Sequence, residues 1–162
     1  TLFPQVKNIK DSVRDMLVEY KDTYIPNKEV DKEKVTFLFI TGGCGFIGSN
    51  FINYYCKKNP DIKVINYDAL YYCAHINNVN KEVRDSDNYT FIEGNLQSYD
   101  LLKHIFQNNN ISHVIHFAAQ SHVQTSFTDS IHYTQDNILG THNLLEANRL
   151  YNPSLNYLYY YG

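Results

Sequence analysis

Several features that would assign this chain to a class of protein are missing from its sequence. Basic residues do not outnumber acidic ones, and with a net charge of -3 we expect no nucleic-acid partner and no anionic-membrane partner. No apolar run reaches the roughly 18 residues needed to cross a bilayer. The first residues lack the apolar core after a basic end that marks a secretory signal, so we expect a cytoplasmic protein.

Cysteine is scarce as well. The three residues Cys44, Cys56 and Cys73 are odd in number and include no C-x-x-C, which favours reduced thiols over a disulfide framework. The best-placed histidines for a shared metal, His113 and His116, are three apart in an expected strand and would point to opposite faces. We therefore expect no metal site.

The sequence divides into two regions that differ in their pattern of apolar and charged residues. Apolar residues recur at helical spacing over residues 6–21, and the charged residues 31–34 read as a linker. We predict a helical extension over residues 1–34 and an incomplete Rossmann-type domain over residues 35–162. The role of the extension cannot be read from its residues.

Strand and helix patterns alternate through the second region. This alternation predicts right-handed β-α-β units, and so an α/β fold with a doubly wound parallel sheet of about five strands. The expected strands are residues 35–40, 63–67, 89–93, 113–117 and 155–161, and the expected helices are residues 46–58, 98–108 and 129–149.

A glycine-rich turn joins the first strand to the first helix of this region. In the pattern Gly43-x-Gly45-x-x-Gly48, the first glycine would let the chain turn sharply off the strand. Gly45 would let a pyrophosphate approach the backbone, and Gly48 would let the helix pack close to the sheet. The helix start offers free N–H groups and partial positive charge to phosphates, so the pattern predicts a dinucleotide site.

An acidic residue follows at the position that such a site requires. Asp68 comes at the end of the second strand, twenty residues after Gly48, where a carboxylate would bind the adenosine ribose hydroxyls. It would repel a 2′-phosphate, and residues 69–71 supply no Arg or Lys to accept one. We therefore expect NAD as the cofactor in preference to NADP.

Four stretches in this order resemble the extended short-chain dehydrogenases, and within them the nucleotide-sugar 4,6-dehydratases. They are Thr-Gly-Gly-Cys-Gly-Phe-Ile-Gly-Ser-Asn (residues 41–50), Asp-Ala-Leu-Tyr-Tyr-Cys-Ala (68–74), His-Phe-Ala-Ala-Gln-Ser-His-Val (116–123) and Asn-Ile-Leu-Gly-Thr-His-Asn-Leu-Leu-Glu (137–146). The Gln-Ser-His-Val stretch is what favours a dehydratase over an epimerase. The resemblance implies NAD-dependent conversion of dTDP- or UDP-glucose to the 4-keto-6-deoxy sugar, and a homodimer for the full-length enzymes.

The resemblance also implies roles for individual residues. Ser121 and His122 would reach the sugar nucleotide, and Asn137 would be a structural asparagine. Asn95 stands where most members have Asp, which would weaken its contact with adenine. The full set expected to bind the cofactor is Gly42, Gly43, Gly45, Phe46, Ile47, Gly48, Asp68, Ala69, Leu70, Asn95, Leu96, Phe117, Ala118, Ala119 and Gln120.

The family's catalytic motifs are not found in this sequence. Members carry Thr-Asp-Glu-Val-Tyr-Gly after the fifth strand and then a helical Tyr-x-x-x-Lys, whereas here the sequence reaches only Tyr161 and Gly162. The Tyr-x-x-x-Lys strings that begin at Tyr24 and Tyr54 both precede the fourth strand. We assign no catalytic residue and expect NAD binding without turnover.

Two alternatives stay open. The first is another extended dehydrogenase, such as a nucleotide-sugar 4-epimerase or decarboxylase. The second is a degenerate, non-enzymatic NAD-binding fragment.

Overall fold

The computed structural model of the protein describes residues 35–151 in full and the backbone of residues 157–160. All of these residues lie in one unit, Asp31–Gly162. The helix expected over residues 6–21 and the linker expected at residues 31–34 lie outside the described residues.

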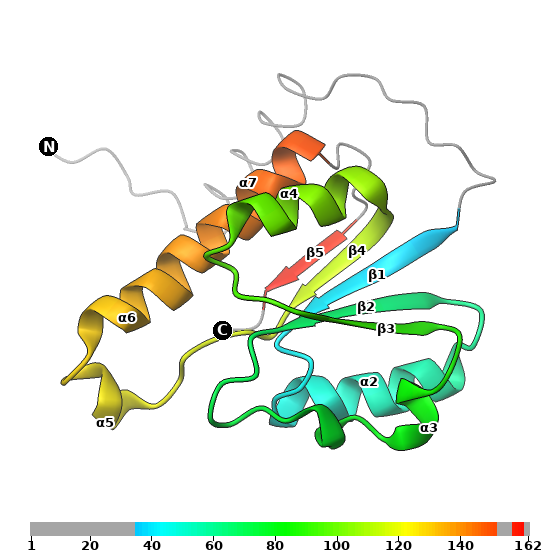
Figure 1. The fold of residues 1–162 in the computed structure, drawn as a ribbon, viewed down its shortest axis with the longest axis horizontal. Helices are drawn as coiled ribbons and strands as arrows, with labels where there is room; N and C mark the ends of the chain where they lie inside the picture. The colour runs from blue at the N-terminus through cyan, green and yellow to red at the C-terminus, as the bar shows by residue number, and fades with distance from the viewer. Residues whose placement is uncertain (1–34, 152–156, 161–162) are drawn as a thin grey trace, which may run out of the picture. The chain divides into compact units, whose positions relative to one another are not determined.

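The described residues form a five-stranded sheet in which every strand pair is parallel (Figure 1). The strand order is β3-β2-β1-β4-β5, which confirms the expected doubly wound α/β fold. The strands are β1 (Thr36–Thr41), β2 (Lys63–Asp68), β3 (Tyr89–Glu93), β4 (Asn110–His116) and β5 (Tyr157–Tyr160).

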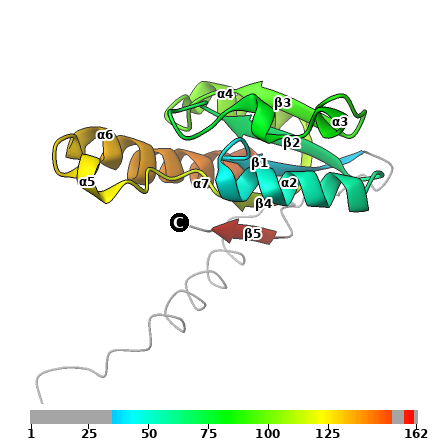
Figure 2. The ribbon, with the colours of Figure 1, turned by 90° about the horizontal axis from the view of Figure 1, so that it is seen from below.

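Helices cover both faces of this sheet. Figure 1 shows α2 and α3 along one face and α4 and α7 along the other. Figure 2 shows α6 running on into α7 as one long rod. The helical elements are α2 (Phe46–Lys58), η1 (Ile76–Asn78), α3 (Lys81–Arg84), α4 (Tyr99–Asn108), α5 (Val123–Ser126), α6 (Ser130–Thr134), the π-helical η2 (Gln135–Leu139) and α7 (Gly140–Tyr151).

Side-chain alternation along β1 produces two separate cores. Phe39 points to the α4 and α7 face, where its ring packs edge-on against Phe106 at 5.2 Å. Leu38 and Ile40 point to the other face and pack in a cluster with Ile52 of α2. Strands buried on both faces explain why their sequences read as nearly continuous apolar runs.

Three elements differ from the expected pattern. The polar loop after Asp68 contains η1 and α3, too short to show helical periodicity, and buried Val79 and Val83 anchor it. Strand β4 begins at Asn110 rather than His113, because Asn110 pairs with Thr36 ahead of an irregularity in the ladder. The expected helix 129–149 contains a π-helical turn, η2.

The sheet order creates a topological switch point at the carboxyl ends of the neighbouring strands β1 and β4. The chain leaves β1 toward one side of the sheet and leaves its neighbour β4 toward the other, so their carboxyl-end loops diverge. Ligands of open α/β sheets bind in the crevice that such diverging loops leave.

Candidate functional site

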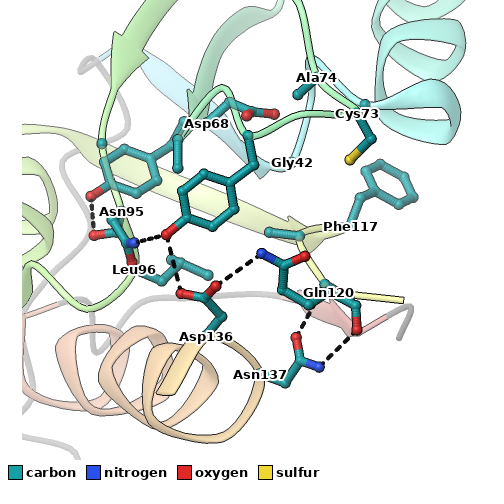
Figure 3. A pocket seen from close by; sticks show the side chains of 17 residues that line it. Gly42, Asp68, Cys73, Ala74, Asn95, Leu96, Phe117, Gln120, Asp136 and Asn137 are labelled. Carbon is teal, nitrogen blue, oxygen red and sulfur yellow. Dashed lines mark hydrogen bonds between the residues drawn. The ribbon is translucent and has the colours of Figure 1, made fainter. Parts of the chain in front are cut away.

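A cleft lies at this switch point (Figure 3). Loops that follow β1, β2, β3 and β4 form its walls, and η2 closes one side. The lining residues are Gly42, Gly45, Tyr67, Asp68, Ala69, Tyr71, Cys73, Ala74, Gly94, Asn95, Leu96, Phe117, Ala118, Ala119, Gln120, Asp136 and Asn137.

Gly42 makes the sharp turn off β1. Its φ is +70°, and a Cβ there would lie 2.5 Å from the backbone nitrogen of Ala118. Only glycine adopts this left-handed conformation at little cost and leaves the loop after β4 room to approach. The sequence pattern assigned this turn to Gly43, but Gly43 is instead packed against the side chains of Asn66 and Ile52.

The N-terminus of α2 faces the cleft without a side-chain cap. Gly45 is the N-cap residue, and the first α-helical hydrogen bond runs from Ser49 N to Gly45 O at 3.0 Å. The N–H groups of the first turn therefore lack intrahelical acceptors. Gly48 packs against the backbone of Gly42 and Gly43, so its missing Cβ brings the helix close to the turn rather than to the sheet.

Asp68 ties the turn to the end of β2. Its Oδ2 accepts the backbone N–H of Cys44 at 2.8 Å, and its Oδ1 accepts that of Leu70 at 2.8 Å. Burial raises the pKa of Asp68 above its ordinary value, and the two backbone N–H groups offset part of this rise. The carboxylate thus holds two loops while lining the cleft.

The opposite wall is a network of side chains around Asp136 of η2. Oδ1 of Asp136 accepts Gln97 Nε2 at 2.7 Å and the Tyr71 hydroxyl at 3.4 Å. Oδ2 accepts Gln120 Nε2 at 3.1 Å and lies 2.9 Å from Nε2 of His132. One carboxylate thus joins the loops that follow β2, β3 and β4, and Figure 3 shows its bond to Gln120.

Two asparagines complete this wall. Asn137 Oδ1 accepts Gln120 N at 2.7 Å, and its Nδ2 donates to Gln120 O at 3.0 Å, so it brackets one peptide unit. This geometry supports the structural part expected of Asn137. Asn95 Nδ2 donates to the Tyr71 hydroxyl at 2.5 Å, and Asn95 Oδ1 accepts Gln97 N at 2.7 Å.

A buried histidine links the end of β1 to α7. His116 ends β4, with Nδ1 at 2.5 Å from Thr41 Oγ1 and Nε2 at 3.0 Å from Thr141 Oγ1. Burial lowers the pKa of His116 to about 4, so the ring is neutral at pH 7. His116 and His113 lie on opposite faces of β4, as the sequence predicted: His116 contacts α7, whereas His113 lies beside Leu38 on the α2 face.

The structure brings together most residues that the sequence proposed for the cofactor. Phe46 and Ile47 present exposed side chains and Leu70 is half-buried, but these three, like Gly43 and Gly48, do not line the cleft. Those that do line it are Gly42, Gly45, Asp68, Ala69, Asn95, Leu96, Phe117, Ala118, Ala119 and Gln120.

Ser121 and His122, proposed for the sugar nucleotide, are exposed and lie outside the cleft. Nδ1 of His122 lies 3.1 Å from Thr125 Oγ1, and His122 O accepts the Tyr133 hydroxyl at 2.9 Å. In the structure, His122 therefore makes its hydrogen bonds with residues of the segment that follows β4.

Sequence reasoning did not single out six lining residues: Tyr67, Tyr71, Cys73, Ala74, Gly94 and Asp136. Tyr71, Cys73 and Ala74 belong to the stretch 68–74 that carries the family resemblance. Including the whole stretch, and not only its first three residues, would have found them. Asp136 gave no such signal, because a carboxylate beside Asn137 in a helical pattern resembles any solvated helix residue.

The described residues contain no group of three metal-ligating side chains close enough to hold an ion. Over the same residues, no helix has the length and apolarity to cross a membrane. Tyr54 and Lys58 lie on α2, where Tyr54 is 67% exposed, and neither lines the cleft. The string that begins at Tyr24 lies outside the described part of the chain.

Comparison with known families now identifies the group to which this fold and cleft correspond. A family model described as GDP-mannose 4,6 dehydratase matches residues 39–160. The chain belongs to this family. Its members are NAD-dependent nucleotide-sugar 4,6-dehydratases of the extended short-chain dehydrogenase type.

Individual relatives agree with this assignment. A dTDP-D-glucose 4,6-dehydratase of Dictyostelium discoideum is 46% identical over 114 residues, which cover 70% of this chain and 26% of that protein. The corresponding mouse protein is 39% identical over 110 residues, covering 68% of this chain and 31% of that protein.

Solved structures also resemble the chain. A dTDP-glucose 4,6-dehydratase from Bacillus anthracis in complex with NAD matches with a TM-score of 0.64 and 36% identity, covering 75% of this chain and 36% of that one. A UDP-glucose 4-epimerase from Thermotoga maritima matches with a TM-score of 0.65 and 27% identity, covering 76% and 37%. The chain thus spans between a quarter and two fifths of the length of these relatives.

Proposed function

We propose that residues 35–151 bind NAD for a nucleotide-sugar 4,6-dehydratase that acts on dTDP- or UDP-glucose. One observation carries this proposal: the uncapped start of α2 and the carboxylate of Asp68 face the same cleft at the switch point. The named substrates of the relatives support the choice of sugar nucleotide.

The glycine turn fits a pyrophosphate. A Cβ on Gly45 would meet only Gly42 O, at 3.4 Å, so the absent side chain leaves open space on the cleft side. The N–H groups of Phe46 and Ile47 have no intrahelical acceptor and would donate to phosphate oxygens. Their exposed side chains do not hinder this, because the amides and not the side chains make the contact.

The charge of the lining favours NAD over NADP. Asp68 and Asp136 are both lining residues, and the lining contains no Lys or Arg. A 2′-phosphate near Asp68 would therefore meet repulsion and find no cation to pair with it. Asp68 would accept the ribose hydroxyls with the lone pairs that Cys44 and Leu70 leave free.

The remaining proposed contacts are apolar or indirect. Leu96 would pack beside adenine, and Phe117, Ala118 and Ala119 would line the cofactor near its centre. Asn95 already uses Oδ1 for Gln97 N and Nδ2 for Tyr71, so its part would be to hold Tyr71 in place.

Bound NAD would supply the hydride acceptor for oxidation of the sugar. Ser121 and His122 would contact the sugar nucleotide from the loop after β4. Taking the proton from the sugar hydroxyl needs a tyrosine beside a lysine. Among the described residues, neither the Tyr54–Lys58 string on α2 nor the Tyr99–Lys103 string on α4 lines the cleft. We therefore expect this 162-residue chain to bind NAD without forming product.

Calorimetric titration tests the binding. We expect NAD to bind with a Kd at least tenfold lower than that of NADP. Asp68→Asn should weaken NAD binding about tenfold, because one amide oxygen cannot replace two carboxylate oxygens. Asp85→Asn, on exposed Asp85 at the end of α3, is the matched control and should bind as the wild type does.

Two outcomes would overturn the proposal. Absence of any NAD binding would leave the chain as a non-binding scaffold. Equal affinity for NAD and NADP would show that Asp68 does not select against the 2′-phosphate. Incubation with NAD and dTDP- or UDP-glucose tests turnover separately. A 4-keto-6-deoxy product would contradict the expected lack of catalysis, and a 4-epimer would indicate an epimerase.

A further inference from the structure

Asp136 stands out among the lining residues because several loops depend on it. It lies in the π-helical turn η2, a type of turn that is often found at functional sites. Its side chain is only 10% exposed, and among the described residues its one ion-pair contact is with His132 rather than with a Lys or Arg. A buried carboxylate of this kind is costly unless hydrogen bonds satisfy it.

Its hydrogen bonds come from three separate loops of the cleft. Tyr71 follows β2, Gln97 follows β3 and Gln120 follows β4. The carboxyl group of Asp136 is therefore the shared anchor of the wall opposite the glycine turn, as Figure 3 shows for its bond to Gln120.

An ionised carboxylate only accepts hydrogen bonds. Its two oxygens offer about four acceptor sites, and its neighbours here present donors to all of them. Because it cannot donate, it fixes the amide groups of Gln97 and Gln120 in one orientation, with Nε2 toward Asp136. An asparagine would pair with either orientation and would hold neither.

The side-chain amide of Asn95 and the carboxylate of Asp136 bind the same Tyr71 hydroxyl, one as donor and the other as acceptor. Asn95 Nδ2 donates to the Tyr71 hydroxyl, and that hydroxyl donates to Asp136. A carboxylate at position 95 would also need the single hydroxyl proton. Two acids would then compete for one donor and repel each other across the tyrosine.

We propose that Asp136 is the positioning residue for NAD in this cleft, acting through Tyr71, Gln97 and Gln120, and that its effect is coupled to the amide of Asn95. The inference rests on the proposed NAD-binding function. Asp136 orders the wall opposite the glycine turn, against which the cofactor lies, rather than binding the cofactor itself.

A double-mutant cycle on the full chain tests the coupling. Asp136→Asn should raise the Kd for NAD about tenfold, and Asn95→Asp should raise it several-fold. The double variant Asn95→Asp/Asp136→Asn restores one carboxylate beside Tyr71, so its Kd should return to within about threefold of the wild-type value. Asp85→Asn is the matched control, and its Kd should not change.

Simple additivity would overturn the proposal, because two unrelated losses of structure multiply their effects on Kd and give no rescue. Wild-type affinity in Asp136→Asn would also overturn it. Thermal unfolding of each variant without ligand separates loss of folding from loss of ordering. If Asp136→Asn fails to fold, Asn95→Asp and the double variant still give the sign of the coupling.

Amide hydrogen exchange without ligand keeps this inference separate from the proposed function. The backbone amides of Gln97 and Gln120 are bonded to Asn95 and Asn137, and in Asp136→Asn they should exchange about tenfold faster. Amides of β1 should not change. If the wild type binds no NAD but these amides respond, the ordering by Asp136 stands and the NAD assignment fails. Unchanged exchange refutes the ordering itself.

Discussion

The two walls of the cleft are built in different ways. The turn wall, residues 41–48 with Asp68, is held mainly by backbone groups: Gly42 N donates to Tyr67 O and Gly45 N to Gly42 O, while Cys44 N donates to the Asp68 carboxylate. The network wall, formed by Tyr71, Asn95, Gln97, Gln120, Asp136 and Asn137, is held mainly by side chains that meet from separate loops.

This difference predicts how each wall responds to substitution. A backbone-built turn depends on a conformation at Gly42 that only glycine adopts readily, so a single methyl group at that position should disrupt it. In a side-chain network, several hydrogen bonds each contribute a modest free energy. A single substitution should therefore weaken the network only in part. Three predictions test this contrast, from the largest expected effect to the smallest.

Gly42→Ala should give the largest effect. Its φ of +70° disfavours any side chain, and the new Cβ would lie 2.5 Å from Ala118 N. We expect a loss of about 4 kcal/mol in the free energy of unfolding, measured by urea denaturation.

Gly45→Ala is the matched control for this turn. Its Cβ would meet only Gly42 O, at 3.4 Å, so folding should be nearly unchanged while NAD affinity falls. Equal loss of stability in the two variants would show that the turn wall does not depend on the left-handed conformation of Gly42.

The pH dependence of stability should report on His116, which links Thr41 of the turn wall to Thr141 of α7. The folded state binds its proton only below about pH 4, whereas the unfolded chain binds it near 6.5. Between these values the unfolded state holds more protons, so stability should rise with pH, by about 3 kcal/mol at most. Urea denaturation from pH 4 to 7 should show a shallower slope for His116→Asn, and an identical slope would refute the assignment.

Asn137→Ala should give the smallest effect. It removes both hydrogen bonds that bracket the Gln120 peptide, but the site is only part-buried and water can replace them in part. We expect a loss of about 1 kcal/mol by urea denaturation, with faster exchange confined to the network wall. A loss as large as that of Gly42→Ala would remove the distinction between the walls.

The turn wall could be predicted from the sequence because its causes are local. Glycine spacing between a strand and a helix, with Asp68 at the next strand end, restricts the backbone to few arrangements. Even here the sequence placed the sharp turn at Gly43, since adjacent glycines cannot be told apart before φ values are known. The structure places it at Gly42.

The network wall could be predicted only in part. The resemblance gave Asn95 and Gln120, whereas Asp136 lies in η2, which the structure shows to be a π-helical turn. Spacing at 3.6 residues per turn cannot reveal such a turn. Tyr71 and Gln97 become hydrogen-bond partners of Asp136 only when separate loops come together in the folded chain, and local sequence patterns do not reveal such tertiary contacts.

The cysteines of the chain differ sharply in their surroundings. Cys44 is buried in the turn, and burial, with a smaller contribution from Asp68, raises the pKa of its thiol to about 11. Burial raises the pKa of Cys56 to about 11 as well. Cys73 is exposed and lines the cleft. A thiol-reactive fluorophore at neutral pH should therefore attach at Cys73 alone, so the native sequence already carries a labelling point for following ligand binding at the cleft.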